Sequence, residues 1–169
     1  MSASTLSETT QYLSFKLEAE EFALAIDKVR EVLDYTAITK VPRTPDFMKG
    51  VINLRGSVVP VVDMRLKFGM SETKKTVNTC IIIVEVALDG ETAILGALAV
   101  SVQEVMELES GQIEPPPKIG ARLRTEFIRG MGKRDNQFII ILDIDKAFST
   151  DEIVLAREAA GEAKEKNTE

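Results

Sequence analysis

Few side chains in this sequence could carry out chemistry. The 169 residues include no histidine and a single cysteine, Cys80. Without histidine there is no Ser-His-Asp or Cys-His arrangement and no imidazole metal ligand, and one cysteine cannot build a thiolate zinc cage. Catalysis would therefore need a cluster of carboxylate or lysine groups, which the sequence does not indicate. We predict a protein that is not an enzyme and that holds neither a cofactor nor a metal.

Two carboxylates and one basic cluster deserve a structural interpretation first. Asp63 and Asp143 each end an apolar stretch, and this repetition favours a cap or turn over a catalytic pair. The cluster Arg122, Arg124 and Arg129 is typical of a solvated helix face, with an acidic partner as the alternative.

The charge balance argues against several partners. There are 21 basic and 27 acidic residues, for a net charge of −6, and aromatic residues make up only 5%. Proteins that bind nucleic acid usually carry a basic excess or aromatic stacking platforms. The longest apolar run, Cys80 to Val84, is too short to cross a bilayer, and Met1 to Thr10 does not resemble a signal peptide. We expect a cytoplasmic protein that binds no nucleic acid and does not insert into the membrane.

The first half of the chain is dominated by alternating apolar patterns. Tyr12 to Leu17 predicts a half-buried strand, and Phe22 to Ile26 predicts its hairpin partner. Thr44-Pro45 suits the start of a brief helix. Val51 to Asp63 predicts two strands around Asn53-Leu54-Arg55-Gly56, where Gly56 can adopt a positive φ. Within the second of these strands, Pro60 predicts an edge or a bulge.

The second half continues in the same way. Cys80 to Val84 is apolar at every position, which predicts a strand buried on both faces. Further elements are expected from similar patterns: a hairpin turn at Asp89-Gly90, strands within Thr92 to Val105, a connector at Pro115 to Pro117, a short helix over Arg122 to Ile128, a strand over Phe138 to Leu142, and from Asp151 a helix with a frayed, solvated end.

An internal repeat organises these elements. Phe47-Met48-Lys49-Gly50 recurs as Phe127-Ile128-Arg129-Gly130, and the same shift of 80 positions relates Asp63 to Asp143 and Phe68 to Phe148. Upstream, Val29-Arg30-Glu31-Val32 resembles Val102-Gln103-Glu104-Val105. The common order of these features favours two similar small barrels that share an apolar seam.

One segment carries a family resemblance. Residues Phe47 to Gly69 read FMKGVINLRGSVVPVVDMRLKFG, which resembles the signature of the CheW chemotaxis coupling family. The similarity extends from about Tyr12 to Ser149 and indicates a stand-alone CheW-like domain.

The resemblance implies a mostly β fold of two intertwined five-stranded SH3-like barrels sharing a core, with short helices and a C-terminal helix. Residues 1–10 are then expected to form a disordered tail, residues 11–150 the CheW-like domain with its two pseudo-repeated subdomains, and residues 151–169 a C-terminal helix and tail.

The function that the resemblance implies is that of an adaptor. Such a protein couples the cytoplasmic tips of methyl-accepting chemoreceptors to the regulatory domain of the histidine kinase CheA. It is expected to be a monomer when free and to be recruited to membrane-associated receptor arrays. The alternative is a CheW-like coupler of another chemosensory pathway, serving surface motility or gene regulation.

The resemblance also implies which residues contact the partners. On the receptor side these are Val29 and Glu31 of the Val-x-Glu motif, Asn53 and Arg55 of the Asn-Leu-Arg-Gly motif, and Ile26 and Val32 as the lining of an apolar groove. From residue types alone, Ile26, Val29 and Val32 are more typical of core. On the kinase side the matched positions are Val58 and Ile119, where Ile119 replaces a residue that is often aromatic.

Overall fold

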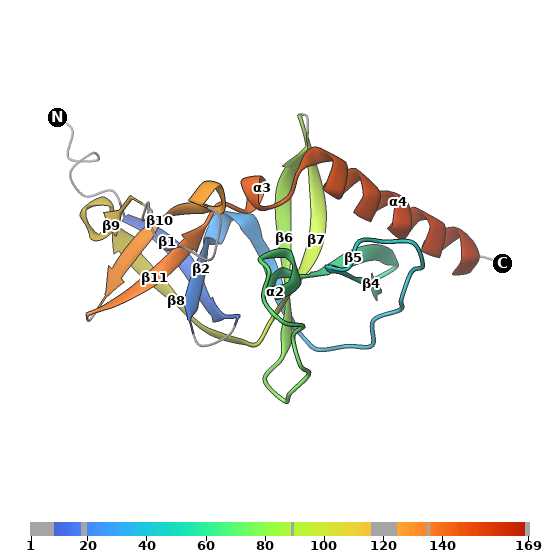
Figure 1. Cartoon of the computed structure of the whole chain (residues 1–169), viewed down its shortest axis with the longest axis horizontal. Helices are drawn as coiled ribbons and strands as arrows, with labels where there is room; N and C mark the ends of the chain where they lie inside the picture. The colour runs from blue at the N-terminus through green and yellow to red at the C-terminus, as the bar shows by residue number, and fades with distance from the viewer. Residues whose placement is uncertain (1–8, 18–19, 89, 116–124, 135, 168–169) are drawn as a thin grey trace.

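Two small β-barrels lie side by side along the long axis of the molecule (Figure 1). A computed structural model describes residues 9–17, 20–88, 90–115, 125–134 and 136–167. The first barrel contains β1 (Thr9–Lys16), β2 (Glu21–Ala25), β8 (Ser101–Glu109), β9 (Ile113–Glu114), β10 (Ile128–Arg134) and β11 (Gln137–Leu142). The second contains β3 (Val29–Asp34), β4 (Met48–Leu54), β5 (Ser57–Asp63), β6 (Cys80–Leu88) and β7 (Glu91–Ala99). The mostly β fold of two SH3-like barrels is confirmed, with the two-residue β9 as an additional sixth strand.

The barrels are intertwined because each takes strands from both halves of the chain. The strand order is β8-β1-β2-β11-β10-β9 in the first sheet and β3-β6-β7-β5-β4 in the second. Strands β1 and β2 from the first half of the chain thus lie between β8 and β11 from the second half. Likewise β6 and β7 from the second half lie between β3 and β5 from the first half. The contact that closes each exchange is parallel, between β11 and β2 in one sheet and between β5 and β7 in the other.

The repeat predicted from the sequence is visible in backbone hydrogen bonds. The amide of Asp63 donates to the carbonyl of Phe47 at 2.6 Å, and the amide of Asp143 donates to the carbonyl of Phe127 at 2.8 Å. Each aspartate precedes a one-turn helix, α2 (Met64–Lys67) or α3 (Ile144–Ala147). Only Asp63 caps its helix with its side chain, which accepts a hydrogen bond from Arg65 N. The predicted cap or turn is therefore confirmed at both positions: Asp63 caps through its side chain, and Asp143 is the N-cap residue of α3, whose backbone carbonyl accepts a hydrogen bond from Lys146 N at 3.0 Å.

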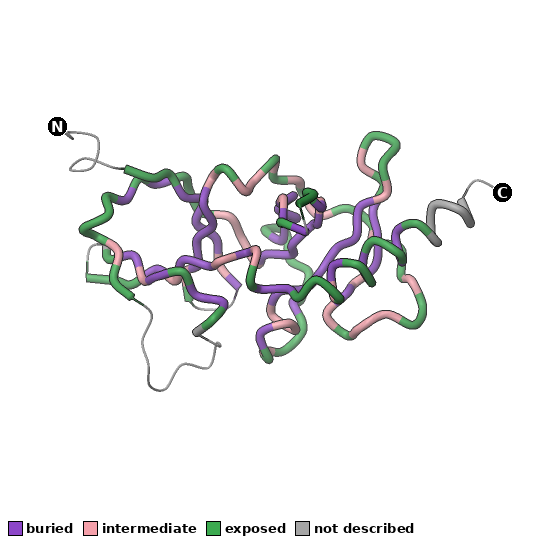
Figure 2. Tube along the Cα trace, turned by 90° about the horizontal axis from the view of Figure 1, so that it is seen from above, coloured by how far each residue is buried: buried purple, intermediate pink, exposed green. Residues whose placement is uncertain are grey.

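The buried apolar residues form three clusters. Figure 2 shows buried residues running through both barrels. One cluster belongs to each barrel, and a larger one, which we call the seam, draws on both sheets. The prediction that β1 is half-buried is wrong: Tyr12 packs in the first-barrel cluster while Phe15 packs in the seam. Both faces of the strand are covered because the second barrel lies against the face that a single sheet would leave in water.

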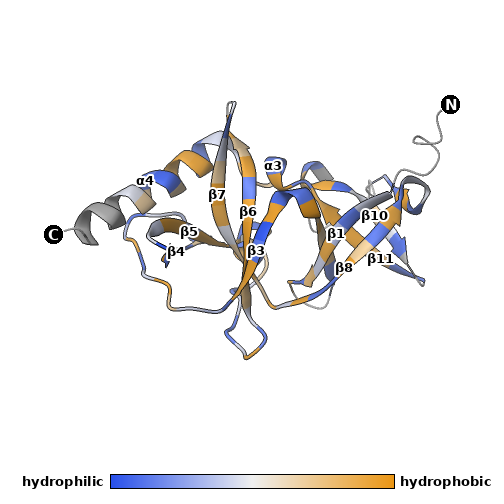
Figure 3. Cartoon of the chain, turned by 180° about the vertical axis from the view of Figure 1, so that it is seen from behind, coloured by the Kyte–Doolittle hydropathy of each residue, from blue (hydrophilic) through white to orange (hydrophobic). Residues whose placement is uncertain are grey.

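The C-terminal helix α4 (Thr150–Asn167) packs against the second barrel. It contributes Ile153, Ala156, Ala159 and Ala160 to the seam cluster. Figure 3 shows it from behind, beside β7 and the β4–β5 hairpin. Of the expected C-terminal segment, the part up to Ala160 is therefore a packed helix, and the helix continues to Asn167. No helix in the described ranges is long and apolar enough to cross a membrane.

Several local expectations need correction. The segment at Thr44-Pro45 forms a turn with no helix, since Met48 N donates to Pro45 O at 3.0 Å and β4 begins at Met48. Over the range Arg122 to Ile128 the described part is a single 3₁₀ turn, η3 (Thr125–Phe127), and β10 begins at Ile128 because that residue pairs with Leu142.

Other expectations are refined. Pro60 lies in β5, an inner strand, but the described ladder between β5 and β7 begins only at Val61. The proline nitrogen therefore needs no partner on that side. Strand β1 begins at Thr9, two residues inside the expected tail, because Thr9 and Thr10 pair with Glu109 and Leu108. The predicted hairpins β1–β2, β4–β5 and β6–β7 are confirmed.

Candidate functional site

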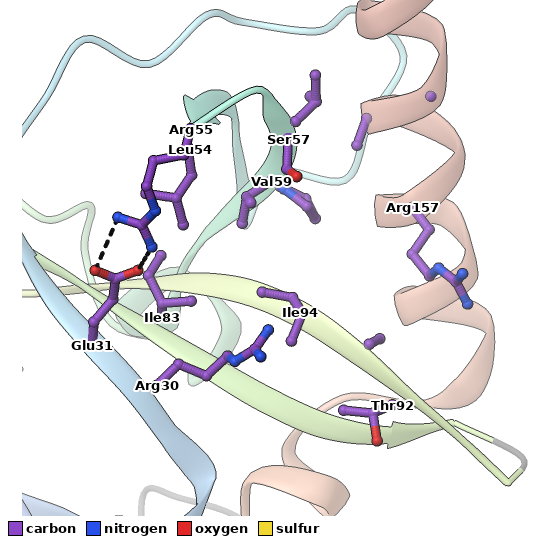
Figure 4. Close-up of a pocket in the computed structure, with 15 residues that line it drawn as sticks. Arg30, Glu31, Leu54, Arg55, Ser57, Val59, Ile83, Thr92, Ile94 and Arg157 are labelled. Carbon is purple, nitrogen blue, oxygen red and sulfur yellow. Dashed lines mark hydrogen bonds and ion pairs between the residues drawn. The ribbon is translucent and has the colours of Figure 1, made fainter.

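A groove of about 860 Å³ lies on the second barrel. One wall is β3, which carries Arg30 and Glu31, and another is the β4–β5 hairpin, which carries Arg55 and Val58. Helix α4 closes the third side with Arg157. Figure 4 shows the charged side chains of these walls, and the apolar residues Ile83 and Ile94 lie between them. We call this surface the arginine groove.

The turn between β4 and β5 positions Arg55 at the rim. Arg55 has a φ of 50° and Gly56 a φ of 88°, so two successive residues take the left-handed conformation that a tight hairpin turn requires. The side-chain oxygen of Asn53 accepts a hydrogen bond from Gly56 N at 2.9 Å and holds this turn. The Asn-Leu-Arg-Gly motif is thus a device that presents one guanidinium group, with Asn53 and Gly56 in positioning roles.

A bulge in β3 positions Glu31 opposite that guanidinium. The register of β3 against β6 shifts between Val29 and Glu31, which leaves Arg30 as the extra residue. The guanidinium of Arg55 donates two hydrogen bonds to the Glu31 carboxylate, one of them Nη1 to Oε2 at 3.4 Å, as the dashed lines in Figure 4 mark. These hydrogen bonds hold the pKa of Glu31 below its ordinary value and raise that of Arg55.

The same bulge separates the residues predicted to bind the receptor. Glu31 pairs with Ile83, which belongs to the second-barrel cluster, whereas Val29 and Val32 pair with Val84 and Ile82, which belong to the seam cluster. In a regular strand Val29 and Glu31 would share a face. Here they lie on opposite faces of β3.

The structure therefore divides the predicted receptor-side set into two groups. Glu31 and Arg55 form an ion pair in the arginine groove, with Asn53 at its turn. Ile26 and Val29 are half-buried and pack against the seam cluster, and Val32, on the same side of β3, is 41% exposed. Of the predicted kinase-side residues, Val58 lines the arginine groove beside Arg55, and Ile119 lies outside the described residues.

Sequence reasoning did not single out Arg30 or Arg157, although both line the groove. Arg30 stood unremarked inside the repeated Val-x-Glu-Val motif. Arg157 lies in a segment whose apolar residues Ile153, Ala156 and Ala160 recur at helical spacing, which was a usable signal for a packed helix. The spacing of apolar residues predicts which face of the helix packs against the barrel. It does not predict which charged residue beside that face lines a groove.

A second polar cluster joins α4 to both barrels. Lys67 Nζ lies 2.7 Å and 2.9 Å from the two carboxylate oxygens of Glu152 and 5.4–5.9 Å from the ring centroids of Phe47, Phe127 and Phe148. Burial alone would raise the pKa of Glu152, but hydrogen bonds from Lys67 and from the Ser149 backbone outweigh burial and lower it. This cluster is a structural clamp on the start of α4.

A third cluster joins the two barrels through Asp145 of α3. Its carboxylate accepts hydrogen bonds from Lys28 Nζ and from Ala87 N, both at 2.8 Å. Burial alone would raise the pKa of Asp145, yet these two hydrogen bonds lower it. Because Lys28 belongs to η1 (Ile26–Lys28), this contact also fixes the chain just before β3.

The arrangement of the groove suits binding. Among the residues that the structure describes, no group of three or more metal-binding side chains comes together. The groove presents guanidinium groups, one carboxylate and an apolar floor, which are the features of a surface that binds proteins.

Comparisons with known proteins found similar sequences and a similar fold. The family model described as "CheW-like domain" matches residues 11–152. "Chemotaxis protein CheW" of Klebsiella aerogenes is 35% identical over 150 residues, which cover 89% of this chain and 88% of that protein. The crystal structure of the scaffolding protein TtCheW from Thermoanaerobacter tengcongensis superposes with a TM-score of 0.74 at 36% identity, covering 85% of this chain and 90% of that one. A more distant match, at 26% identity, is Protein FrzA of Myxococcus xanthus, covering 83% of this chain and 86% of that protein.

Proposed function

Because this chain belongs to the CheW-like domain family, we propose that it is a chemotaxis adaptor that couples methyl-accepting chemoreceptors to the histidine kinase CheA. The observation that carries the proposal is the family match over residues 11–152, with relatives named as chemotaxis proteins along almost the whole chain. In this role the protein acts by holding its partners together and performs no catalysis.

The receptor side of the proposal rests on β3 and the adjacent hairpin turn. A receptor tip is a helical hairpin, and helices are commonly bound by an apolar surface with charges at its rim. The half-buried Ile26 and Val29 and the exposed Val32 supply apolar surface on one side of β3, and the Glu31–Arg55 pair supplies charge on the other. Contact along β3 can therefore involve both groups of predicted receptor residues.

The kinase side of the proposal is carried by Val58, which lines the arginine groove together with Arg55. This neighbourhood has a consequence for assembly. If the regulatory domain of CheA covers Val58, it approaches the predicted receptor residue Arg55 closely, so the bound receptor and kinase lie next to each other on the adaptor. Recruitment of the adaptor to receptor arrays follows from simultaneous binding.

The first experiment is a calorimetric titration of the protein with the regulatory domain of CheA, with Arg55→Glu measured in parallel. We expect the unmodified protein and Arg55→Glu both to bind, with a micromolar Kd, which corresponds to a binding free energy of about −8 kcal/mol. The variant should bind because Arg55 is assigned to the receptor side. Absence of binding by the unmodified protein would contradict the coupling function while leaving the fold intact.

A second candidate is a coupler of a different chemosensory pathway, favoured by the match to Protein FrzA, whose name does not mention chemotaxis. The two candidates differ in the kinase that is bound. Titration with the regulatory domains of each such kinase in the host separates them, since selective binding to a kinase outside the chemotaxis pathway would favour the second.

A further inference from the structure

The arginine groove has a local charge opposite to that of the whole protein. Its charged lining residues are three arginines, Arg30, Arg55 and Arg157, and one carboxylate, Glu31. The chain as a whole carries a net charge of −6. Arg55 is paired with Glu31, which also lines the groove, whereas Arg30 and Arg157 have their acidic neighbours, Glu85 and Glu91, outside the lining.

These two arginines are held only loosely by the protein itself. Arg30 Nε lies 3.6 Å from Glu85, and Arg157 Nη1 lies 3.5 Å from Glu91. The arginine side chains are 57% and 49% exposed, so solvent screens both ion pairs strongly. A partner carboxylate can therefore replace these contacts at small cost.

The two side chains also stand on different elements. Arg30 is the bulge residue of β3, and Arg157 lies beside α4 on the opposite side of the groove, with Ile94 between them (Figure 4). A guanidinium group binds a carboxylate through two parallel hydrogen bonds, which an ammonium group cannot match. An apolar floor between two such groups suits a segment with carboxylates at its edges and an apolar side chain in the middle.

We propose that the arginine groove binds an acidic, amphipathic segment of a partner protein, and that Arg30 and Arg157 select it by pairing with its carboxylates. This inference goes beyond the proposed coupling function, because Arg157 lies outside the family match over residues 11–152. It depends on the charge of the groove and does not require that the partner be a receptor or CheA.

The test is fluorescence anisotropy with the full chain and a fluorescein-labelled helical peptide built from glutamate, leucine and alanine. Titrations compare the unmodified protein with Arg30→Gln/Arg157→Gln. The matched control is Arg129→Gln/Lys133→Gln, which removes the same charge from exposed positions on β10 of the first barrel. We expect the groove variant to bind at least about tenfold more weakly and with a smaller salt dependence, and the control to change affinity by less than about twofold.

Three results would overturn the inference: no saturable binding, equal loss in both double variants, or equal binding of a peptide with lysine in place of glutamate. Stronger binding to vesicles of anionic lipid, lost in the same groove variant, would assign the surface to membranes instead. Arg30→Lys/Arg157→Lys keeps the charge, and it should bind with intermediate affinity if bidentate pairing matters. Circular dichroism melts confirm that each variant is folded.

Discussion

The ring of Phe47 lies 5.8 Å from the ring of Phe148, centroid to centroid. A shift of 80 positions turns this pair into Phe127 and Phe68, whose rings lie 5.7 Å apart. In each pair one ring comes from the first half of the chain and the other from the second half. The exchange of strands between the barrels is therefore accompanied by a matched exchange of aromatic contacts at the seam.

This relationship predicts measurable coupling between the halves. A double-mutant cycle of Phe47→Leu and Phe148→Leu should give a coupling free energy of about 0.5–1.5 kcal/mol, because each single change already removes the ring contact. Urea unfolding measures it. As a control, the changes in free energy of unfolding from Phe47→Leu and Ile139→Val should add, because Ile139 lies in the first-barrel cluster. Additive changes in the Phe47–Phe148 cycle would show that the ring contact contributes nothing.

Gly50 should tolerate no side chain. Its φ is 145°, and an added Cβ would lie 2.1 Å from the carbonyl oxygen of Thr39. We expect Gly50→Ala to destabilise the protein by at least about 2 kcal/mol, since strain and a backbone clash combine. The control is Gly56→Ala, which has a positive φ of 88° but open space around it, and which should cost about 1 kcal/mol. Equal costs in thermal or urea unfolding would contradict the assignment of a clash.

The clamp on α4 predicts a dependence of stability on pH. The pKa of Glu152 is lowered in the folded protein, whereas the unfolded value is about 4.3. The clamp is therefore fully stabilising above pH ~5 and loses its effect as pH falls below the unfolded pKa and through the folded one. Lys67→Met should reduce the free energy of unfolding most at neutral pH, and the difference should shrink toward pH ~3.5. A difference that is constant with pH would show that Lys67 acts only through the three phenylalanine rings.

Charge reversal at the hairpin turn should affect binding more than folding. Arg55 is 71% exposed, so Arg55→Glu should leave the thermal midpoint nearly unchanged while weakening capture of a receptor tip in a pull-down. We expect the swap Glu31→Arg/Arg55→Glu to remain defective, because the partner needs a guanidinium group at the turn. Full recovery in the swap would instead show that only the internal ion pair matters, and loss of folding in Arg55→Glu would make that residue structural.

Much of the fold could be predicted because it depends on near neighbours. Turn chemistry placed the β4–β5 hairpin at Arg55-Gly56, and period-two patterns found most strands. The helix expected at Thr44-Pro45 is absent because strand pairing outweighs the local preference. Proline suits the first turn of a helix, but the chain pairs with β5 from Met48 onward.

The site was predicted only in part. The resemblance assigned Val29 and Glu31 to the same partner, but the bulge at Arg30 places their side chains on opposite faces of β3. A bulge places one extra residue opposite a residue of the partner strand. Its position depends on the pairing with that strand, so the local sequence pattern does not predict it.

By itself the sequence determined the β-rich class, the internal repeat, the lack of histidine, and the turn that presents Arg55. The class and the turn follow from residue types and from spacings of a few positions, and the repeat follows from comparing the two halves of the sequence with each other. The tertiary structure decided that strands are exchanged between the halves, that Phe47 meets Phe148, and that Val58, Arg30 and Arg157 share a groove with the Glu31–Arg55 pair. Such contacts join residues from β3, the β4–β5 hairpin and α4, and their free energy arises only when all of these elements are packed together.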